Sequence, residues 1–364
     1  MALIFEGRQD GGSSLIKTLG GWRTADLRFA AFGAHFWARF QLAAWKELEG
    51  AKCVAIYNRT VLKAEKLADE LSIPAVYGDP KELLRREELH FVDIITDVFS
   101  HSRFVHMVAA RRLPVICQKP MAPSLAEAET MVETCREAGV PFYIHENWRW
   151  QTPIRQLKKV LDAGEIGTPF RARLTMVSGY LVFINEPARK DWEEFILWDM
   201  GTHILDVARL LFGEAQTIYC QVHRVHPDIK GEDIATVMMK MGGKTTVICE
   251  LGYAENYLEH DKFPETFAFV ESDKGSLEPG PDYWIRVTAK SGTLAKRCPP
   301  PMYPWLDPDC AVVHSSIVPC NADLLQALRG EGAAETTAED NIKTMALTSA
   351  AYDSARSGKA IHLD

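Results

Sequence analysis

The fold is decided by one stretch near the start of the chain, Leu27-Arg-Phe-Ala-Ala-Phe-Gly-Ala-His-Phe-Trp-Ala38. Its first six residues form an apolar run typical of a buried strand. A glycine follows, and then a helical pattern that extends from Phe36 to Leu48. A strand, a glycine turn and a helix in this order begin the βαβ unit of a dinucleotide-binding fold.

The turn matches the dinucleotide fingerprint Gly-x-Gly-x-x-Gly/Ala in part. Gly33 fills the first position and Ala38 is an allowed third, but His35 stands where the second glycine lets the backbone approach the pyrophosphate. This half-motif supports a cofactor site and an ordinary βα turn about equally. For a cofactor site, the contacting residues are predicted to be Gly33, His35, Phe36 and Trp37.

The alternation of apolar runs and helical patterns continues to about residue 150. Further apolar runs occupy 52–57, 91–95, 114–117 and 141–144, with helical patterns at 61–71, 100–111 and 124–138. This rhythm predicts a doubly wound parallel sheet that binds ligands at the carboxyl ends of its strands. Beyond it, strands bounded by glycine or proline are predicted at 170–178, 217–225, 235–241, 245–253, 266–272 and 284–289, and helices at 153–163, 198–212, 321–329 and 338–357.

The fold class is therefore expected to be α/β, with two domains. An extension over 1–26 precedes an N-terminal Rossmann dinucleotide-binding domain over 27–150. The second domain, over 151–364, is predicted to be α+β with a large, mostly antiparallel open sheet. Its terminal helix could pack back on the first domain.

Composition narrows the class of protein. The 364 residues are 47% hydrophobic and 25% charged with a formal net charge of −8, which is typical of a globular protein and disfavours nucleic-acid binding. No apolar run approaches the roughly 18–20 residues of a membrane span, and the N-terminus does not read as a secretory leader. The eight cysteines are scattered without a CxxC pair, so we expect neither metal nor disulfides. A soluble, cytoplasmic protein is predicted.

The end of the second predicted strand bears on the choice of cofactor. Asn58 and Arg59 stand where an NAD site usually has a carboxylate for the ribose hydroxyls. A neutral residue and a cation there remove repulsion against a 2′-phosphate and supply a partner for it. NADP is therefore slightly favoured over NAD, with a solvated turn as the alternative.

Two further motifs carry candidate catalytic groups. Lys119 follows the fifth predicted strand, where it would face the ligand crevice, although such a lysine is more often a surface residue. In Asp199-Met-Gly-Thr-His203 the i, i+4 spacing predicts that the carboxylate and the imidazole share a helical face. A carboxylate beside a histidine suits proton transfer, whereas a helix-start aspartate and a packed histidine are the commoner reading.

The order of these motifs resembles the Gfo/Idh/MocA oxidoreductases, the family of glucose–fructose oxidoreductase and inositol dehydrogenase. The resemblance extends from about Leu27 to the end of the chain. It rests on Gln118-Lys-Pro120 in place of Glu-Lys-Pro, Thr96 followed by His101, Asn147-Trp-Arg-Trp150, Leu161 to Gly167, Asp199 to Asp206 with Leu211-Phe-Gly-Glu214, and Ala351 to Gly358.

The resemblance implies an NAD(P)-dependent dehydrogenase of a sugar or polyol. Lys119 would hydrogen-bond the reacting hydroxyl, His203 would be the general base, and Asp199 would bind substrate or orient the imidazole. The remaining implied contacts are Thr96, His101 and Gln118 for the cofactor, and Trp148 and Arg149 for the substrate. The open sheet would form a homo-oligomer, a dimer or tetramer.

Two alternatives stay open at this point. Some relatives are redox-assisted glycosidases or lyases that recycle the nicotinamide. The departure at His35 also suits a sensor that binds a sugar or nucleotide without catalysis.

Overall fold

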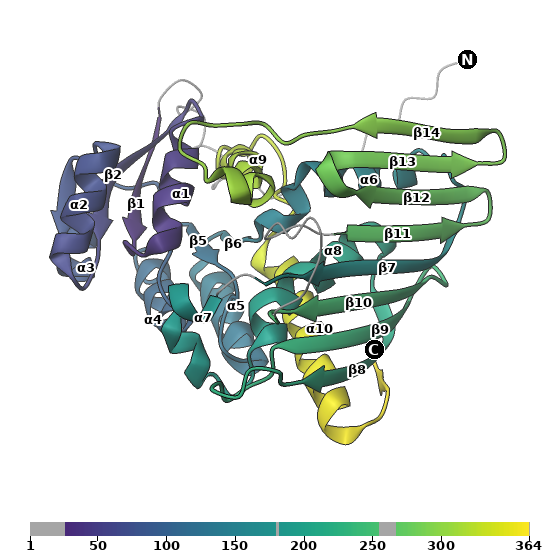
Figure 1. Ribbon diagram of the computed structural model, residues 1–364. Coiled ribbons are helices and arrows are strands. Elements are labelled where there is room, and N and C mark those ends of the chain that lie inside the picture. Colours follow the sequence, from purple (N-terminus) through teal and green to yellow (C-terminus); the bar gives the residue numbers. More distant parts are fainter. Residues whose placement is uncertain (1–25, 180–181, 255–266, 364) are drawn as a thin grey trace, which may run out of the picture.

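The computed structural model describes residues 26–179, 182–254 and 267–363, which form two sheets side by side (Figure 1). The first sheet is parallel, with strand order β3-β2-β1-β4-β5-β6. Its strands are β1 (Leu27–Phe32), β2 (Ala51–Tyr57), β3 (Ala75–Tyr77), β4 (Phe91–Ile94), β5 (Val115–Gln118) and β6 (Phe142–His145). This is the Rossmann order, so the predicted fold class is confirmed for this half.

Five helices connect the parallel strands. They are α1 (Phe36–Trp45), α2 (Val61–Leu71), α3 (Pro80–Arg86), α4 (Val98–Ala109) and α5 (Leu125–Ala138). The strand order reverses between β1 and β4, and a ligand crevice is expected at this point, outside the carboxyl ends of the strands.

Gly33 holds the turn between β1 and α1 against the neighbouring strand. Its φ is +112°, and a Cβ atom added there would lie 2.3 Å from the carbonyl oxygen of Ile95. Its N–H donates to the Tyr57 carbonyl at 2.7 Å. At His35, by contrast, φ is −82°, a value open to any residue, so the backbone does not require the second glycine of the fingerprint.

The second sheet has nine strands in the order β14-β13-β12-β11-β7-β10-β9-β8-β15. Its strands are β7 (Pro169–Val177), β8 (Ala215–His223), β9 (Ile234–Met241), β10 (Thr246–Gly252), β11 (Phe267–Ser272), β12 (Gly275–Gly280), β13 (Trp284–Ala289), β14 (Gly292–Arg297) and β15 (Ile361–His362). Only β7 and β10 pair in parallel among its described strands, so the expected mostly antiparallel sheet is confirmed.

Helices cover one face of this second sheet. They are α6 (Thr152–Asp162), which lies behind β12 and β13, α8 (Thr202–Phe212), behind β7 and β10, and α10 (Ala338–Ser357), behind β8. Figure 1 shows the opposite face turned toward the viewer without a helix across it. Alternate residues of the strands, such as Ala172, Leu174 and Met176 of β7, are therefore buried under the helices.

The last two helices return to the first sheet. Helix α9 (Ala311–Leu328) packs on α1, where Phe40 and Ala44 meet Ile317 and Val318, and α10 contacts α5. Sequence analysis placed the start of this helix at about residue 321, ten residues after its actual start and beyond Pro319. The helix instead continues through the proline, and that predicted boundary was wrong.

Within the described residues, no helix is long and apolar enough to cross a membrane.

We predict that Gly33→Ala destabilises the protein by about 1–3 kcal/mol, because the new Cβ meets the Ile95 carbonyl and the residue keeps a left-handed φ. Urea unfolding would measure this loss. The matched control is Gly332→Ala, at a glycine with open space around its Cβ position and an ordinary φ, where little change is expected. Equal effects at the two positions would contradict the steric argument.

Candidate active site

Lys119 and Asp199 meet between the two sheets. Lys119 follows β5, and its Nζ donates to the backbone carbonyl of Asp199 at 2.9 Å and lies 3.5 Å from the Asp199 Oδ1 atom. The Asp199 side chain is 1% exposed, whereas that of Lys119 is 17% exposed. Two predicted catalytic residues that are 80 positions apart are thus brought into contact, with the lysine still open to solvent.

Arg189 is a second cationic partner of Asp199. It belongs to a 3₁₀ turn, Pro187–Asp191, and its guanidinium forms ion pairs with Asp199 and Glu186. Burial by itself would raise the pKa of Asp199, but Arg189 and then Lys119 outweigh it and lower the pKa, so the carboxylate is ionised. Sequence analysis missed Arg189, because it lies in a loop without a readable motif.

The backbone around Asp199 is a π-helix, Leu197–Gly201, which leads directly into α8. A π-helix closes i→i+5 hydrogen bonds, so the i, i+4 alignment that sequence analysis assumed for Asp199 and His203 does not apply there. The Asp199 carboxylate turns to Lys119 and Arg189, and the structure shows no hydrogen bond between it and His203 in the described part of the chain.

His203 is held instead by Glu146, directly after β6. The His203 Nδ1 lies 2.5 Å from the Glu146 Oε1, and the Trp148 ring stacks on the imidazole with 4.0 Å between centroids. Burial, followed by the charge of Lys119, holds the His203 pKa well below its usual range, so the imidazole is neutral. Its Nε2 has no hydrogen-bond partner among the described residues.

Glu146 stands at the end of a strand, where a carboxylate is structural more often than functional. The carboxyl is completely buried, and burial raises its pKa to about 7. Its Oε2 lacks a hydrogen-bond partner in the described regions. A usable signal existed: Glu146 follows β6 as Lys119 follows β5, and both positions lie at the carboxyl edge of the sheet.

Gln118 supports the backbone beside Lys119. Its Oε1 accepts from the Lys119 N–H at 3.1 Å, while its Nε2 donates to the Gln41 Oε1 at 2.5 Å and lies 3.1 Å from the His145 Nδ1. Burial lowers the pKa of His145 to about 4, so that ring is neutral and can accept from the amide. The substitution of Gln118 for the family's glutamate therefore leaves a connected buried network.

The start of α1 fits the pyrophosphate of a dinucleotide. No side chain caps this helix and its first turn carries no acidic residue, so the N–H groups of Phe36 and Trp37 remain available to an anion. His35 and Phe36 are exposed, while the Trp37 ring packs against His314 of α9 with 5.8 Å between centroids. The residues at the start of α1 thus fit a pyrophosphate, to which Trp37 would contribute its backbone N–H group.

The other predicted cofactor residues divide into exposed and supporting positions. Asn58 is buried, and its Oδ1 accepts from the Ala34 N–H at 3.2 Å, so it braces the glycine turn. Arg59 is exposed and forms no ion pair with a described residue. Thr96 is half-buried, but His101 is 1% exposed, with its ring nitrogens facing the carbonyls of Thr96, Pro120 and Met121. We assign His101 to the support of the crevice.

Comparison with known proteins places this geometry in a family. The model described as "Oxidoreductase family, NAD-binding Rossmann fold" matches residues 27–146, and that of the GFO/IDH/MocA C-terminal domain matches residues 154–278. The chain belongs to the GFO/IDH/MocA family. It is an NAD(P)-dependent dehydrogenase that acts on a CH–OH group.

Several relatives of this GFO/IDH/MocA chain cover nearly its whole length. D-apiose dehydrogenase of Rhizobium rhizogenes is 37% identical over 93% of this chain and 98% of its own. The Paraburkholderia graminis enzyme of the same name is 35% identical, over 92% and 89%. A solved oxidoreductase from Agrobacterium radiobacter, in complex with NAD⁺, L-tartaric acid and magnesium, superposes with a TM-score of 0.90 at 37% identity, over 93% and 98% of the two chains.

Arg149, an expected substrate contact, lies in a network of ion pairs within the protein. Its guanidinium binds both carboxylate oxygens of Asp206, the carboxylate of Asp340 and the carbonyl of Glu335. These contacts join the turn after β6 to α8 and α10, and they commit the donors of Arg149 to protein acceptors. Trp148 is buried and stacks on the His203 imidazole, so its ring does not form an open face for a sugar.

We predict that Arg149→Ala destabilises the protein by about 3–5 kcal/mol, because Asp206, which is 0% exposed, loses its bidentate partner. Urea unfolding would measure the loss. Arg136→Ala is the control: its pair with Glu133 is exposed, and little change is expected. A raised KM for the substrate at unchanged stability would restore the substrate role.

Proposed function

We propose that this protein oxidises a hydroxyl carbon of an aldose, with D-apiose or a close analogue as the substrate. The observation that carries this proposal is the meeting of Lys119, Asp199 and the neutral His203 at the carboxyl ends of β5 and β6. The two full-length relatives called D-apiose dehydrogenase supply the substrate class.

The mechanism follows from the charges of the site. Lys119 donates a hydrogen bond to the reacting hydroxyl and stabilises negative charge on its oxygen. The Nε2 of His203 takes the hydroxyl proton while the C–H bond breaks and the carbonyl forms. Asp199, kept ionised by Arg189, fixes the ammonium of Lys119. Bound NAD(P)⁺ supplies the hydride acceptor, and Gly33 with the start of α1 would hold its pyrophosphate.

Both NAD and NADP are proposed to bind, with NADP slightly favoured. Arg59 is exposed beside the end of β2, and Asn58 leaves no carboxylate there to repel a 2′-phosphate. The A. radiobacter relative was solved with NAD⁺, which argues for acceptance of the unphosphorylated form as well.

A cytoplasmic location is also proposed, because all eight cysteines are free. The functional boundary between the domains is proposed near residue 150.

The test is a panel of D-apiose, D-xylose, myo-inositol and levoglucosan, each with NAD⁺ and NADP⁺, followed by absorbance of the reduced nicotinamide. We expect oxidation of D-apiose. Lys119→Met and His203→Asn should each lower kcat on the order of 100-fold, because each removes a group that acts on the hydroxyl. Cleavage of a glycoside without accumulation of NAD(P)H would favour the redox-assisted lyase, and failure to bind any dinucleotide would favour the sensor.

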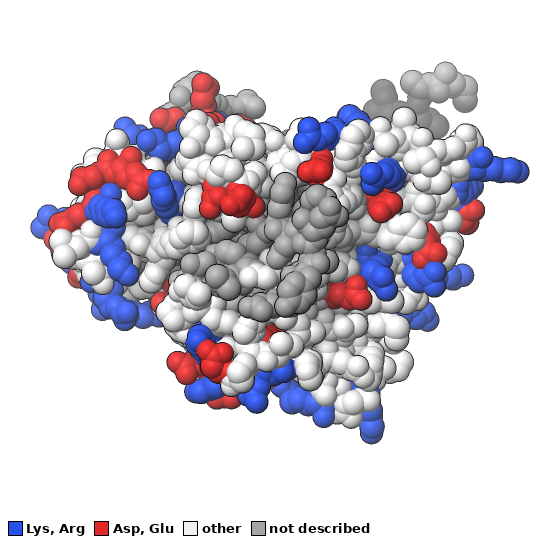
Figure 2. Space-filling view, in the orientation of Figure 1, with Lys and Arg blue, Asp and Glu red and all other residues white. Residues whose placement is uncertain are grey.

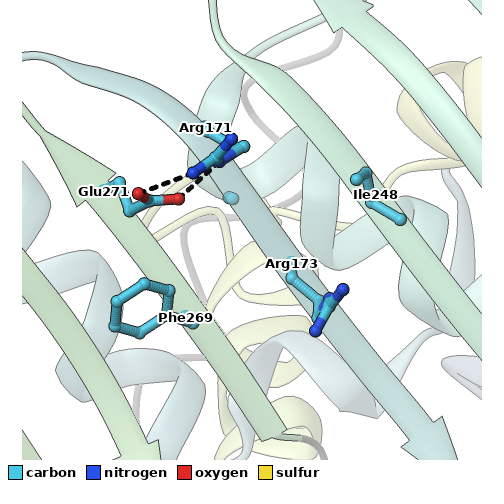
Figure 3. Close-up of a pocket in the computed structure, with 6 residues that line it drawn as sticks. Arg171, Arg173, Ile248, Phe269 and Glu271 are labelled. Atoms are coloured by element: carbon cyan, nitrogen blue, oxygen red, sulfur yellow. Dashed lines mark hydrogen bonds and ion pairs between the residues drawn. The ribbon is translucent and has the colours of Figure 1, made fainter.

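A homo-oligomer through the open face of the second sheet is part of the proposal. Across this face, Phe269 of β11 is 43% exposed and Met238 of β9 is 48% exposed. Figure 3 shows Phe269 and Ile248 beside Arg171, Arg173 and Glu271, which line a hollow on the same face. The charges here are paired, Arg171 with Glu271 and Arg173 with Glu250. Apolar side chains among neutralised charges suit a subunit contact.

The surface charge agrees with a small-molecule partner. Figure 2 shows basic and acidic side chains interspersed on the viewed face, without a large field of one sign. Neither nucleic acid nor membrane is proposed as a partner.

We predict that light scattering of the purified protein finds a dimer or tetramer, and that Phe269→Arg shifts it toward the monomer, because an unpaired cation would be buried in the contact. The control is Phe170→Arg, at a residue that is 51% exposed but follows the opposite alternation of β7. A monomeric wild-type protein would contradict this prediction.

A further inference from the structure

We propose that Glu146 is the positioning residue of His203, which keeps the imidazole protonated at Nδ1 and thereby leaves the Nε2 lone pair for the proton of the substrate. The inference rests on the proposed function only in that His203 is the base. The family resemblance had given Asp199 the role of binding the substrate or orienting the imidazole.

Two N–H groups converge on one oxygen of Glu146. Its Oε1 accepts from the Trp148 N–H at 3.2 Å and lies 2.5 Å from the His203 Nδ1. An ionised carboxylate can only accept hydrogen bonds, so the proton in the second contact belongs to Nδ1. A neutral imidazole with its proton on Nδ1 has its acceptor at Nε2, and this nitrogen has no partner among the described residues.

The surroundings hold this arrangement in place. The side chains of Glu146 and His203 are 0% and 2% exposed, so water does not compete for their contact. Trp148 stacks on the imidazole with planes 22° apart, which restricts rotation of the ring. Glu146 follows β6 of the first sheet and His203 lies on α8, so the contact also joins the two halves of the protein.

Asp199 makes no hydrogen bond to His203 in the described part of the chain and is engaged by other partners. Its Oδ1 faces Lys119 and its Oδ2 faces Arg189. The two carboxylates near His203 therefore have different roles. Asp199 holds Lys119, and Glu146 orients His203.

Because the Glu146 carboxyl can take up a proton, we expect activity to depend on pH. The charged groups around its carboxyl are Lys119, Arg149 and Asp206, and its titratable but neutral neighbour is His203. Burial raises the pKa of Glu146 to about 7, and the two cations oppose this rise. Below that pH the protonated carboxyl donates to Nδ1, the imidazole proton moves to Nε2, and the base is lost. Activity should therefore fall as pH decreases through about 7.

The experiment compares kcat against pH for the wild-type protein, Glu146→Gln and Glu146→Ala, with saturating sugar and cofactor. In Glu146→Gln the two N–H donors select the amide oxygen at the Oε1 position, so the Nδ1–H form is kept. We expect this variant to retain most of kcat at high pH, with its acid limb moved to lower pH because glutamine does not titrate. Glu146→Ala should lose on the order of 100-fold in kcat with little change in KM.

Glu232→Gln is the matched control. This carboxylate is also buried and accepts from the N–H groups of Phe195 and Ile196 and from the Tyr352 hydroxyl, but it has no contact with His203. It should leave the acid limb in place. An acid limb in Glu146→Gln equal to that of the wild type, or a kcat of Glu146→Ala within twofold of it, would overturn the proposal.

A second measurement does not depend on turnover. Nitrogen-15 NMR of the histidines in the cofactor-free protein, with His203 assigned by its loss in His203→Asn, should show Nδ1–H in the wild type and in Glu146→Gln. Glu146→Ala should move the ring toward Nε2–H. Retention of Nδ1–H in Glu146→Ala would overturn the inference. Absence of sugar oxidation by the wild type, with the tautomers as expected, would instead refute the proposed function alone.

Discussion

The contact between Lys119 and Asp199 is the interaction on which the active site depends. It joins the carboxyl edge of the parallel sheet to the π-helix that precedes α8. Asp199 is buried, and an ionised carboxylate is stable there only because Lys119 and Arg189 offset the cost of removing it from water. The geometry of the lysine is thus set by a charge balance that spans both halves of the protein.

A second cluster of charged residues joins the elements that carry this contact. Arg149 joins Asp206 and Asp340, and Arg209 binds the same two carboxylates from α8. These groups connect the turn after β6 to α8 and α10. Because Trp148 and Glu146 lie in that same turn, the position of His203 depends on this ion network.

The outcome for individual residues shows where sequence reasoning succeeds. Gly33 was identified as the first glycine of the dinucleotide fingerprint, and the structure places the Ile95 carbonyl where a side chain would begin. Arg189 and Glu146 could not be ranked from the sequence, because their importance comes from partners 10 and 57 positions away, in the π-helix and in α8. The start of α9 was placed too late because the helix continues through Pro319, where Ile317 and Val318 pack on α1 and tertiary packing outweighs local propensity.

The sequence by itself determined the alternation of strands and helices, the glycine turn and the identity of Lys119, Asp199 and His203 as candidate groups. These follow from local periodicity and from motifs in which chemistry and spacing are written in neighbouring residues. Only the tertiary structure decided which carboxylate serves which partner. A π-helix turns Asp199 toward two cations, and the burial of Glu146 against His203 leaves that glutamate to orient the base, because long-range packing and desolvation, rather than spacing along the chain, set these pairings.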